Sequence, residues 1–262
     1  MKKPASLISF LGLAVLACGL TAQHASAGII QIDPSLLSGT ATVDFEDLGL
    51  GNSAQVTFNT FESGFTLFGE RFVGQTLSTS GDFDILAGAP TGPLTVVSGL
   101  PSQSVTAIDG GAGDVGNTAI AGSGPAGYPA ANAVGEGSIA ILFDFDQSEF
   151  GFDIVGGNGG TATAQFWARD GSLLAQIIFN LTSSVFDSFG FRSDDGKVIA
   201  GVSIFNNDPG GIGFDNFVSD VPGVPGDPGD PVPEPSTLAL VGTGLMLVWR
   251  RARLVRSLPR KG

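Results

Sequence analysis

Almost all the side chains of this chain that could carry chemistry are carboxylates. The 262 residues include 25 Asp and Glu, but only one Cys and one His, which are Cys18 and His24 near the N-terminus. If this terminus is removed on export, the mature chain has no thiol nucleophile, no imidazole base and no disulfide. Hydrolysis would then need a pair of carboxylates or a Ser–Lys dyad, and Lys197 is the one lysine between residues 28 and 260.

Paired carboxylates of the kind that glycosidases use occur in the segment FDFD. Asp144 and Asp146 would lie on one face of a strand, with Cβ atoms about 7 Å apart, which is within the glycosidase range. Such pairs arise by chance in so acidic a chain, so the signal is weak. Trp167 and Tyr128 could stack on a sugar ring, but Trp167 fits a core position equally well.

The sequence therefore predicts a non-catalytic binding or structural protein. A secreted glycoside-active enzyme that uses paired carboxylates is the first alternative. A surface- or ice-adhesion protein is the second, and it is weakened because no regular Thr-x-Thr ladder is present.

The N-terminus has the pattern of a secretory signal. Lys2 and Lys3 precede an apolar stretch over residues 7–20, and Ala25-Ser26-Ala27 is a small-residue cleavage site. We expect residues 1–27 to direct the chain to the Sec machinery and to be cleaved after Ala27. Lipoprotein processing at Cys18 is the alternative, and Leu16 fits its pattern poorly.

The charges are divided unequally along the chain. All 25 acids lie in residues 33–234, where there are only four bases, so this part carries a net charge of −21. Such a field repels nucleic acid and anionic lipid and attracts cations. Six bases follow from Arg250 onward, and they would hold the end of the chain on the cytoplasmic side of a membrane.

Alternation with a period of two dominates residues 28–220. It is clearest in segments 139–145, 161–168 and 173–179, and 40 Gly and 20 Phe accompany it. Many short strands without an amphipathic helix predict an all-β domain, an antiparallel β-sandwich or jelly roll. Asp170-Gly171 predicts a two-residue hairpin turn that places Phe166 and Phe179 in the core.

Two further segments depart from this pattern. Residues 101–137 are rich in Gly, Ala, Ser and Pro, and predict a long excursion across one end of the sandwich, either a ligand loop or a disordered insertion. Residues 221–231 are rich in Pro and Gly, and predict a semi-extended linker.

Residues 232–257 form a third region with three parts in order. Val232, Pro233, Glu234 and Pro235 come first, an apolar run from Leu238 to Trp249 follows, and a basic cluster ends it. As a helix the apolar run would be about 18 Å long, against a hydrocarbon core of about 30 Å. It is short for a permanent anchor but suits transient membrane insertion, because arginines can snorkel.

This region resembles the PEP-CTERM family of sorting tails. The Pro-Glu-Pro motif corresponds to Val232–Pro235, and the family's basic cluster corresponds to Arg250, Arg251, Arg253 and Arg256. The resemblance implies recognition and cleavage by exosortase, a membrane enzyme of Gram-negative bacteria. It also implies export through the inner membrane to the cell envelope or matrix, often in association with exopolysaccharide and biofilm. A plain membrane anchor is the alternative.

The body more loosely resembles β-sandwich domains that precede such tails. In similar carbohydrate-binding jelly rolls, a Phe-Glu near the start and an Asp near the end share a structural calcium ion. The matching residues here are Glu46 in DFEDL and Asp215 in FDNF, on the first and last predicted strands. The resemblance implies a Ca²⁺ site at Glu46 and Asp215, and the alternative is that both are solvated acids at strand ends.

Overall fold

The computed structural model describes residues 28–50, 55–97, 99, 104–109, 117–130, 133–183 and 186–220. These residues belong to one compact unit that ends at Val221, and a second unit runs from Pro222 to Gly262. Within the described part of the chain, no helix is long and apolar enough to cross a membrane. The predicted linker, sorting region and C-terminal hydrophobic helix lie outside the described residues.

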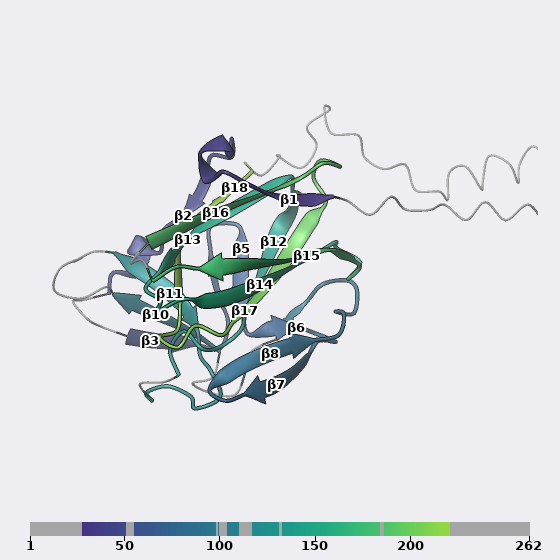
Figure 1. Cartoon of the computed structure of the whole chain (residues 1–262). Helices are drawn as coiled ribbons and strands as arrows, with labels where there is room; N and C mark the ends of the chain where they lie inside the picture. Colours follow the sequence, from purple (N-terminus) through teal and green to yellow (C-terminus); the bar gives the residue numbers. More distant parts are fainter. Residues whose placement is uncertain are drawn as a thin grey trace, which may run out of the picture. The chain divides into compact units, whose positions relative to one another are not determined.

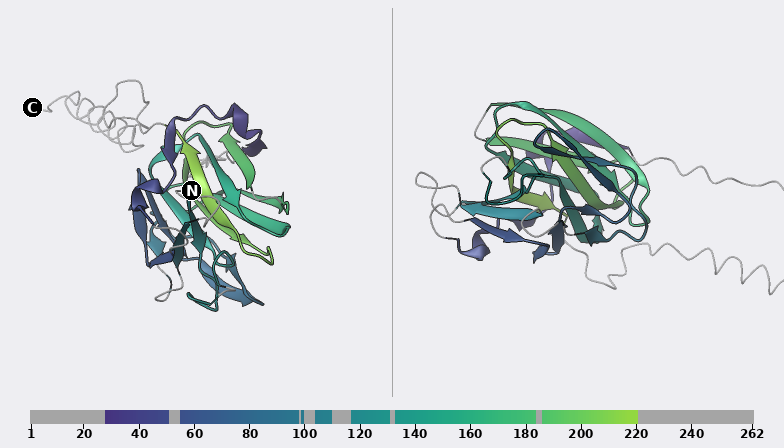
Figure 2. Two further views of the ribbon diagram at one scale, coloured as in Figure 1. Left: turned by 90° about the vertical axis from the view of Figure 1, so that its left-hand side faces the viewer. Right: turned by 90° about the horizontal axis from the view of Figure 1, so that it is seen from below.

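Two antiparallel sheets pack face to face and form a β-sandwich (Figures 1 and 2). The larger sheet, called sheet A, has the order β1 (Ile29–Ile32), β16 (Phe186–Ser193), β13 (Glu149–Val155), β18 (Gly213–Ser219), β11 (Thr118–Gly122), β10 (Val105–Asp109) and β3 (Gln55–Phe58), with β2 (Ala41–Val43) also paired to β18. Sheet B has the order β15 (Leu173–Leu181), β14 (Gly160–Trp167), β17 (Ile199–Asn206), β12 (Ile139–Gln147), β5 (Thr66–Gly69) and β4 (Phe61–Ser63). The predicted all-β sandwich is confirmed.

Two small two-stranded sheets accompany the sandwich. One pairs β6 (Arg71–Phe72) with β9 (Val96–Val97), and the other is the hairpin of β7 (Thr76–Ser80) and β8 (Phe83–Ala87). Strand β8 packs against β17, and Figure 1 shows the β7–β8 hairpin at the lower edge of the domain. The two 3₁₀ turns are η1 (Pro34–Leu36) and η2 (Glu46–Leu48).

Phenylalanine rings fill the space between the sheets. Phe150 and Phe152 of β13 contact Phe217 of β18, with ring centroids 5.6 and 6.0 Å apart. The predicted core residues Phe166 and Phe179 are buried in the same cluster. Aromatic rings bury large apolar areas, so this interior supplies most of the hydrophobic driving force for folding.

A second apolar cluster lies on the outer face of sheet B. Phe72 and Leu94 cover Ala140, Trp167 and Ala200 there. This layer explains why Trp167 is buried although alternation places it opposite the main core, and Gln165 on the same face accepts a hydrogen bond from Gln75 at 3.0 Å. A period-two pattern reports which residues share a face, but it does not report that a further layer covers the outer face.

The Asp170-Gly171 hairpin exists, but its predicted two-residue turn is wrong. The amide of Ala168 donates to the carbonyl of Ser172, and the amide of Gly171 donates to the carbonyl of Ala168, both at 2.9 Å. Gly171 has φ +85°. The loop therefore has three residues, a turn over Arg169 and Asp170 followed by a left-handed glycine, which is the arrangement that leaves a bulge beside it.

The predicted long excursion over residues 101–137 is also wrong for its described parts. Strands β10 and β11 pair over five residues, from Val105 opposite Gly122 to Asp109 opposite Thr118. Both strands lie inside sheet A and carry small buried residues. Ala and Gly suit these positions because neighbouring chain segments approach closely, so a composition that resembles a loop here belongs to the core.

Candidate functional site

The two predicted calcium ligands lie where the first part of the chain meets the last strand. Strand β2 pairs with β18 from Val43 opposite Phe217 to Ala41 opposite Ser219. Asp215 is on β18, as predicted, but Glu46 begins η2 three residues beyond β2, so its placement on a strand is wrong. The carboxylate of Glu46 accepts a hydrogen bond of 2.6 Å from the amide of Thr118 in β11.

Two unusual backbone conformations flank this pair of acids. Phe45 and Asn216 have φ values of +61° and +49°, and they are the only non-glycine residues of the described chain with positive φ. A left-handed Phe costs about 1–3 kcal/mol. Packing of its ring in the core offsets this cost, because the ring contacts Phe68 and Phe217 with centroids 5.5 and 5.6 Å away. The chain thus reverses sharply just before Glu46.

Asp215 is in an unfavourable environment for a charge. It is 1% exposed, and burial raises its pKa to about 7. The amide of Asn216 donates to its Oδ1 at 2.6 Å and lowers this pKa, whereas the neighbouring charges of Glu46, Asp153 and Asp44 raise it. Excess negative charge around a buried carboxylate is an arrangement that a bound cation would relieve.

The donor set is nevertheless incomplete. Among the described residues, no group of three or more His, Cys, Asp and Glu side chains is placed to hold a metal ion. Asp153, opposite Asp215 in register, already accepts hydrogen bonds from Ser188 at 2.6 Å and Asn216 at 2.9 Å. Glu46 and Asp215 would therefore need water or main-chain oxygens to complete the six to eight ligands that Ca²⁺ takes.

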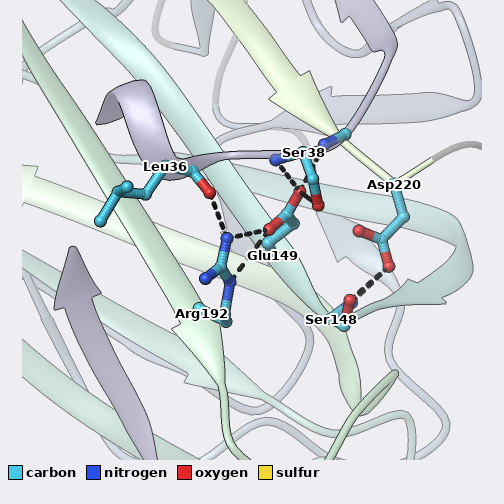
Figure 3. A network of polar contacts seen from close by, with 7 residues as sticks. Leu36, Ser38, Ser148, Glu149, Arg192 and Asp220 are labelled. Atoms are coloured by element: carbon cyan, nitrogen blue, oxygen red, sulfur yellow. Dashed lines mark hydrogen bonds and ion pairs between the residues drawn. The ribbon is translucent and has the colours of Figure 1, made fainter. Parts of the chain in front are cut away.

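A second polar site connects the first and last described segments of the domain to sheet A (Figure 3). Glu149 of β13 is 2% exposed, and its Oε1 accepts hydrogen bonds from the amide and hydroxyl of Ser38 at 2.5 and 2.8 Å and from the amide of Gly39. Its Oε2 accepts two from Arg192 of β16, from Nε at 3.1 Å and from Nη2 at 2.8 Å. We call these contacts, with those described next, the chain-end network.

The network also includes backbone groups near both ends of the domain. Arg192 donates to the carbonyl of Leu36 in η1, and Asp220 accepts from the amide and hydroxyl of Ser148 at 2.8 and 2.7 Å. A Cβ on Gly39 would lie 2.2 Å from the carbonyl oxygen of Ser219, so only glycine fits beside the end of β18. The η1 turn is thus held by Arg192 of β16, and the last described residue, Asp220, is held by Ser148, which precedes β13.

Electrostatics favours a structural role for this network. Burial alone would raise the pKa of Glu149, but hydrogen bonds from Arg192 and the Ser38–Gly39 segment outweigh it and lower the pKa. The carboxylate therefore stays ionised and fully hydrogen-bonded, which suits an anchor and not a proton-transfer group. Sequence reasoning missed the network, because Ser38 and Glu149 are 111 positions apart and neither lies in a motif.

The other candidate residues have structural surroundings. Trp167 is 2% exposed and donates from Nε1 to Ser203 at 3.0 Å, so it is a core residue and not a sugar platform. Asp146 pairs with Arg169 through Nη2 at 2.7 Å at the surface. The suggested Asp144–Asp146 pair therefore has one member in an ion pair with Arg169.

The comparisons with known proteins concern the end of the chain. Residues 231–253 match the family model described as the PEP-CTERM protein-sorting motif. The match includes Val232–Pro235, the apolar run and Arg250, Arg251 and Arg253, so the predicted sorting tail is confirmed. No curated protein and no solved structure matches the chain.

Proposed function

We propose that the β-sandwich of this chain is a non-catalytic module of the cell envelope or extracellular matrix. The premise is that the chain carries a PEP-CTERM tail and is exported and sorted to the cell surface by exosortase. The module would bind or organise exopolysaccharide. The sorting motif at residues 231–253 is the observation that carries this proposal. The all-β domain supports it, because a rigid sandwich with fastened ends is suited to presenting a surface and not to a moving active site.

The charge of the domain supports a neutral polysaccharide partner. Residues 28–220 contain 22 acids and four bases, a net charge of −18, so anionic polymers would be repelled. Exopolysaccharide extracted from producing cells tests the proposal directly. The exported protein should co-sediment with the polymer at physiological salt and release no reducing sugar. Release of reducing ends would favour the glycoside-active alternative, and absence of co-sedimentation would contradict the proposal.

We further propose that Ca²⁺ stabilises the domain at Glu46 and Asp215. Support comes from the pairing of β2 with β18 and from the negative charge gathered around the buried Asp215. A cation there would offset the negative charge of Glu46, Asp153 and Asp44 around Asp215, and would tie the η2 turn to the last strand.

A further inference from the structure

A pocket of about 240 Å³ lies apart from both sites described above. It is lined by the β7–β8 hairpin, the residue after β5 and the segment after β11, and it is open to solvent on one side. Its lining residues are Glu70, Leu77, Thr79, Asp84, Ser123, Gly124 and Pro125. This volume is below the range of about 300–1,000 Å³ of typical ligand pockets, which suits a single small ring and not a long ligand.

The hairpin register directs three side chains to this pocket. Thr79 of β7 lies directly opposite Asp84 of β8, and Leu77 lies two residues before Thr79 on the same face. Thr79 is exposed, and Asp84 is 2% exposed. The hairpin therefore supplies an apolar contact, a hydroxyl and a carboxylate to one wall.

The opposite wall contributes a second buried carboxylate. Glu70 is 3% exposed, and Ser138 joins it to Asp84, because its hydroxyl donates to the Glu70 carbonyl at 3.0 Å and its amide to Oδ2 of Asp84 at 3.1 Å. Arg71 forms an ion pair with Oε2 of Glu70, so one buried carboxylate of the pocket already has a cationic partner.

These groups define the chemistry of a ligand. Carboxylates only accept hydrogen bonds, so any ligand group that contacts the carboxylates of Glu70 or Asp84 must be a donor. Sugar hydroxyls donate to carboxylates and also exchange hydrogen bonds with Thr79 and Ser123, while Leu77 and Pro125 offer apolar contact to the C–H edge of a ring. A carboxylated sugar would be repelled by Glu70, Asp84 and the acidic domain.

We propose that this pocket binds one neutral sugar residue, with ring hydroxyls donating to Glu70 and Asp84. The inference rests on the proposed polysaccharide-binding function and gives it a location. Asp84 and Glu70 act as hydrogen-bond acceptors, and Thr79 stands at the exposed side of the pocket, where a larger side chain would block entry.

The test uses the full chain in a detergent without a sugar headgroup, with methyl glycosides of glucose, galactose and mannose as probes. Saturation-transfer NMR and titration should detect binding of at least one of them, and weaker binding of glucuronate. Asp84→Asn should weaken binding about tenfold, because one charged acceptor is lost. Thr79→Trp should abolish it by filling the pocket.

Ser78→Trp is the matched control, since Ser78 is exposed and points to the other face of the same strand. It should leave binding unchanged. Equal binding by all three variants, or binding of glucosamine alone, would overturn the neutral-sugar site. Co-sedimentation of wild type and Thr79→Trp with exopolysaccharide separates the two proposals. If both bind equally, the site is wrong and the module function stands, whereas absence of binding by wild type overturns both.

Discussion

Substitution of Glu149 by Gln tests whether the chain-end network holds the domain together. Oε1 of Glu149 receives its bonds from Ser38 and Gly39, and Oε2 receives two from Arg192. Glutamine keeps one acceptor, so its NH₂ group must face either the guanidinium or the Ser38 amide, and both of these are donors. Breaking one side of a buried ion pair costs about 3–5 kcal/mol of folding stability. Because Arg192 is 37% exposed, we expect Glu149→Gln to lower the free energy of unfolding by about 3 kcal/mol, the lower end of this range.

Asp146→Asn is the matched control. The Arg169–Asp146 pair has the same chemistry, but its side chains are 38% and 36% exposed. Exposed pairs contribute about 0–1 kcal/mol, so this variant should lose less than about 1 kcal/mol. A larger loss of stability in Glu149→Gln than in Asp146→Asn would therefore be due to the burial of Glu149.

Urea unfolding followed by tryptophan fluorescence provides the measurement. Trp167 is the only tryptophan upstream of the tail, and it is buried, so its emission reports the sandwich. With a slope of about 2–3 kcal/mol/M, Glu149→Gln should lower the midpoint at pH 7 by about 1 M, and Asp146→Asn by less than about 0.4 M. Equal shifts in the two variants would refute the argument that the network is a buried anchor.

The pH dependence gives a further check on the same variant. The pKa of Glu149 is lowered in the folded state, so the unfolded state binds more protons and the stabilisation is present above the unfolded pKa. It is lost as pH falls through the folded pKa. The difference between wild type and Glu149→Gln should therefore shrink on acidification below about pH 4. A difference that stays constant down to pH 2 would mean that the charge of Glu149 contributes nothing.

Three other predictions follow from the tail, the cation site and the pocket. Pro233→Ala with Glu234→Ala should leave the protein in the inner membrane, and mass spectrometry of the wild-type surface form should find no peptide from residues 238–262; recovery of an intact tail there would contradict sorting. Millimolar Ca²⁺ should raise the melting temperature, by the equivalent of about 2.7 kcal/mol at 100-fold excess over the dissociation constant, and Asp215→Asn should remove most of the gain; identical melting with and without chelator would leave Asp215 an ordinary acid. Burial raises the pKa of Asp84 to about 6, and although the Ser138 amide and the Arg71 charge oppose this, its folded pKa stays above the unfolded value of 3.8. As pH rises from 4 to 8, the free energy of unfolding of the wild type should therefore fall by about 2 kcal/mol relative to that of Asp84→Asn. Parallel curves of stability against pH for the two proteins would contradict this.

The fold could be predicted where one face of a strand meets the core and the other meets solvent. Ile139, Ile141 and Phe143 alternate in the sequence, and all three are buried in the main core. Prediction failed where this condition does not hold. Strands β10 and β11 are buried on both faces, so they show no alternation, and their small residues resemble a loop.

The sites show the same division between local and long-range information. The sorting tail could be predicted because its three parts are contiguous, so the order of residues is itself the signal. Asp84 and Glu70 were missed because neither lies in a motif, and Ser138, which hydrogen-bonds to both residues, is more than 50 positions away from each. No local spacing rule reports a contact of this kind.

The arrangement of the two polar sites within the domain bears on how a tethered module would meet its ligand. The chain-end network holds η1 and the end of β18, which Figure 1 shows at the top of the domain, whereas the β7–β8 hairpin that walls the pocket lies at the bottom. The last described residue, Asp220, is fixed to Ser148, and the Pro- and Gly-rich segment begins just after it. Tension applied to the chain beyond Asp220 would therefore load β18, β13 and β16 of sheet A first. Of the elements that line the pocket, β7, β8 and β5 are not paired with these three strands, whereas β11 pairs with β18 at Ile120 opposite Phe214, two residues before its end at the pocket. The hairpin side of a sugar site placed there would keep its geometry while the domain is tethered, which is what a matrix module requires.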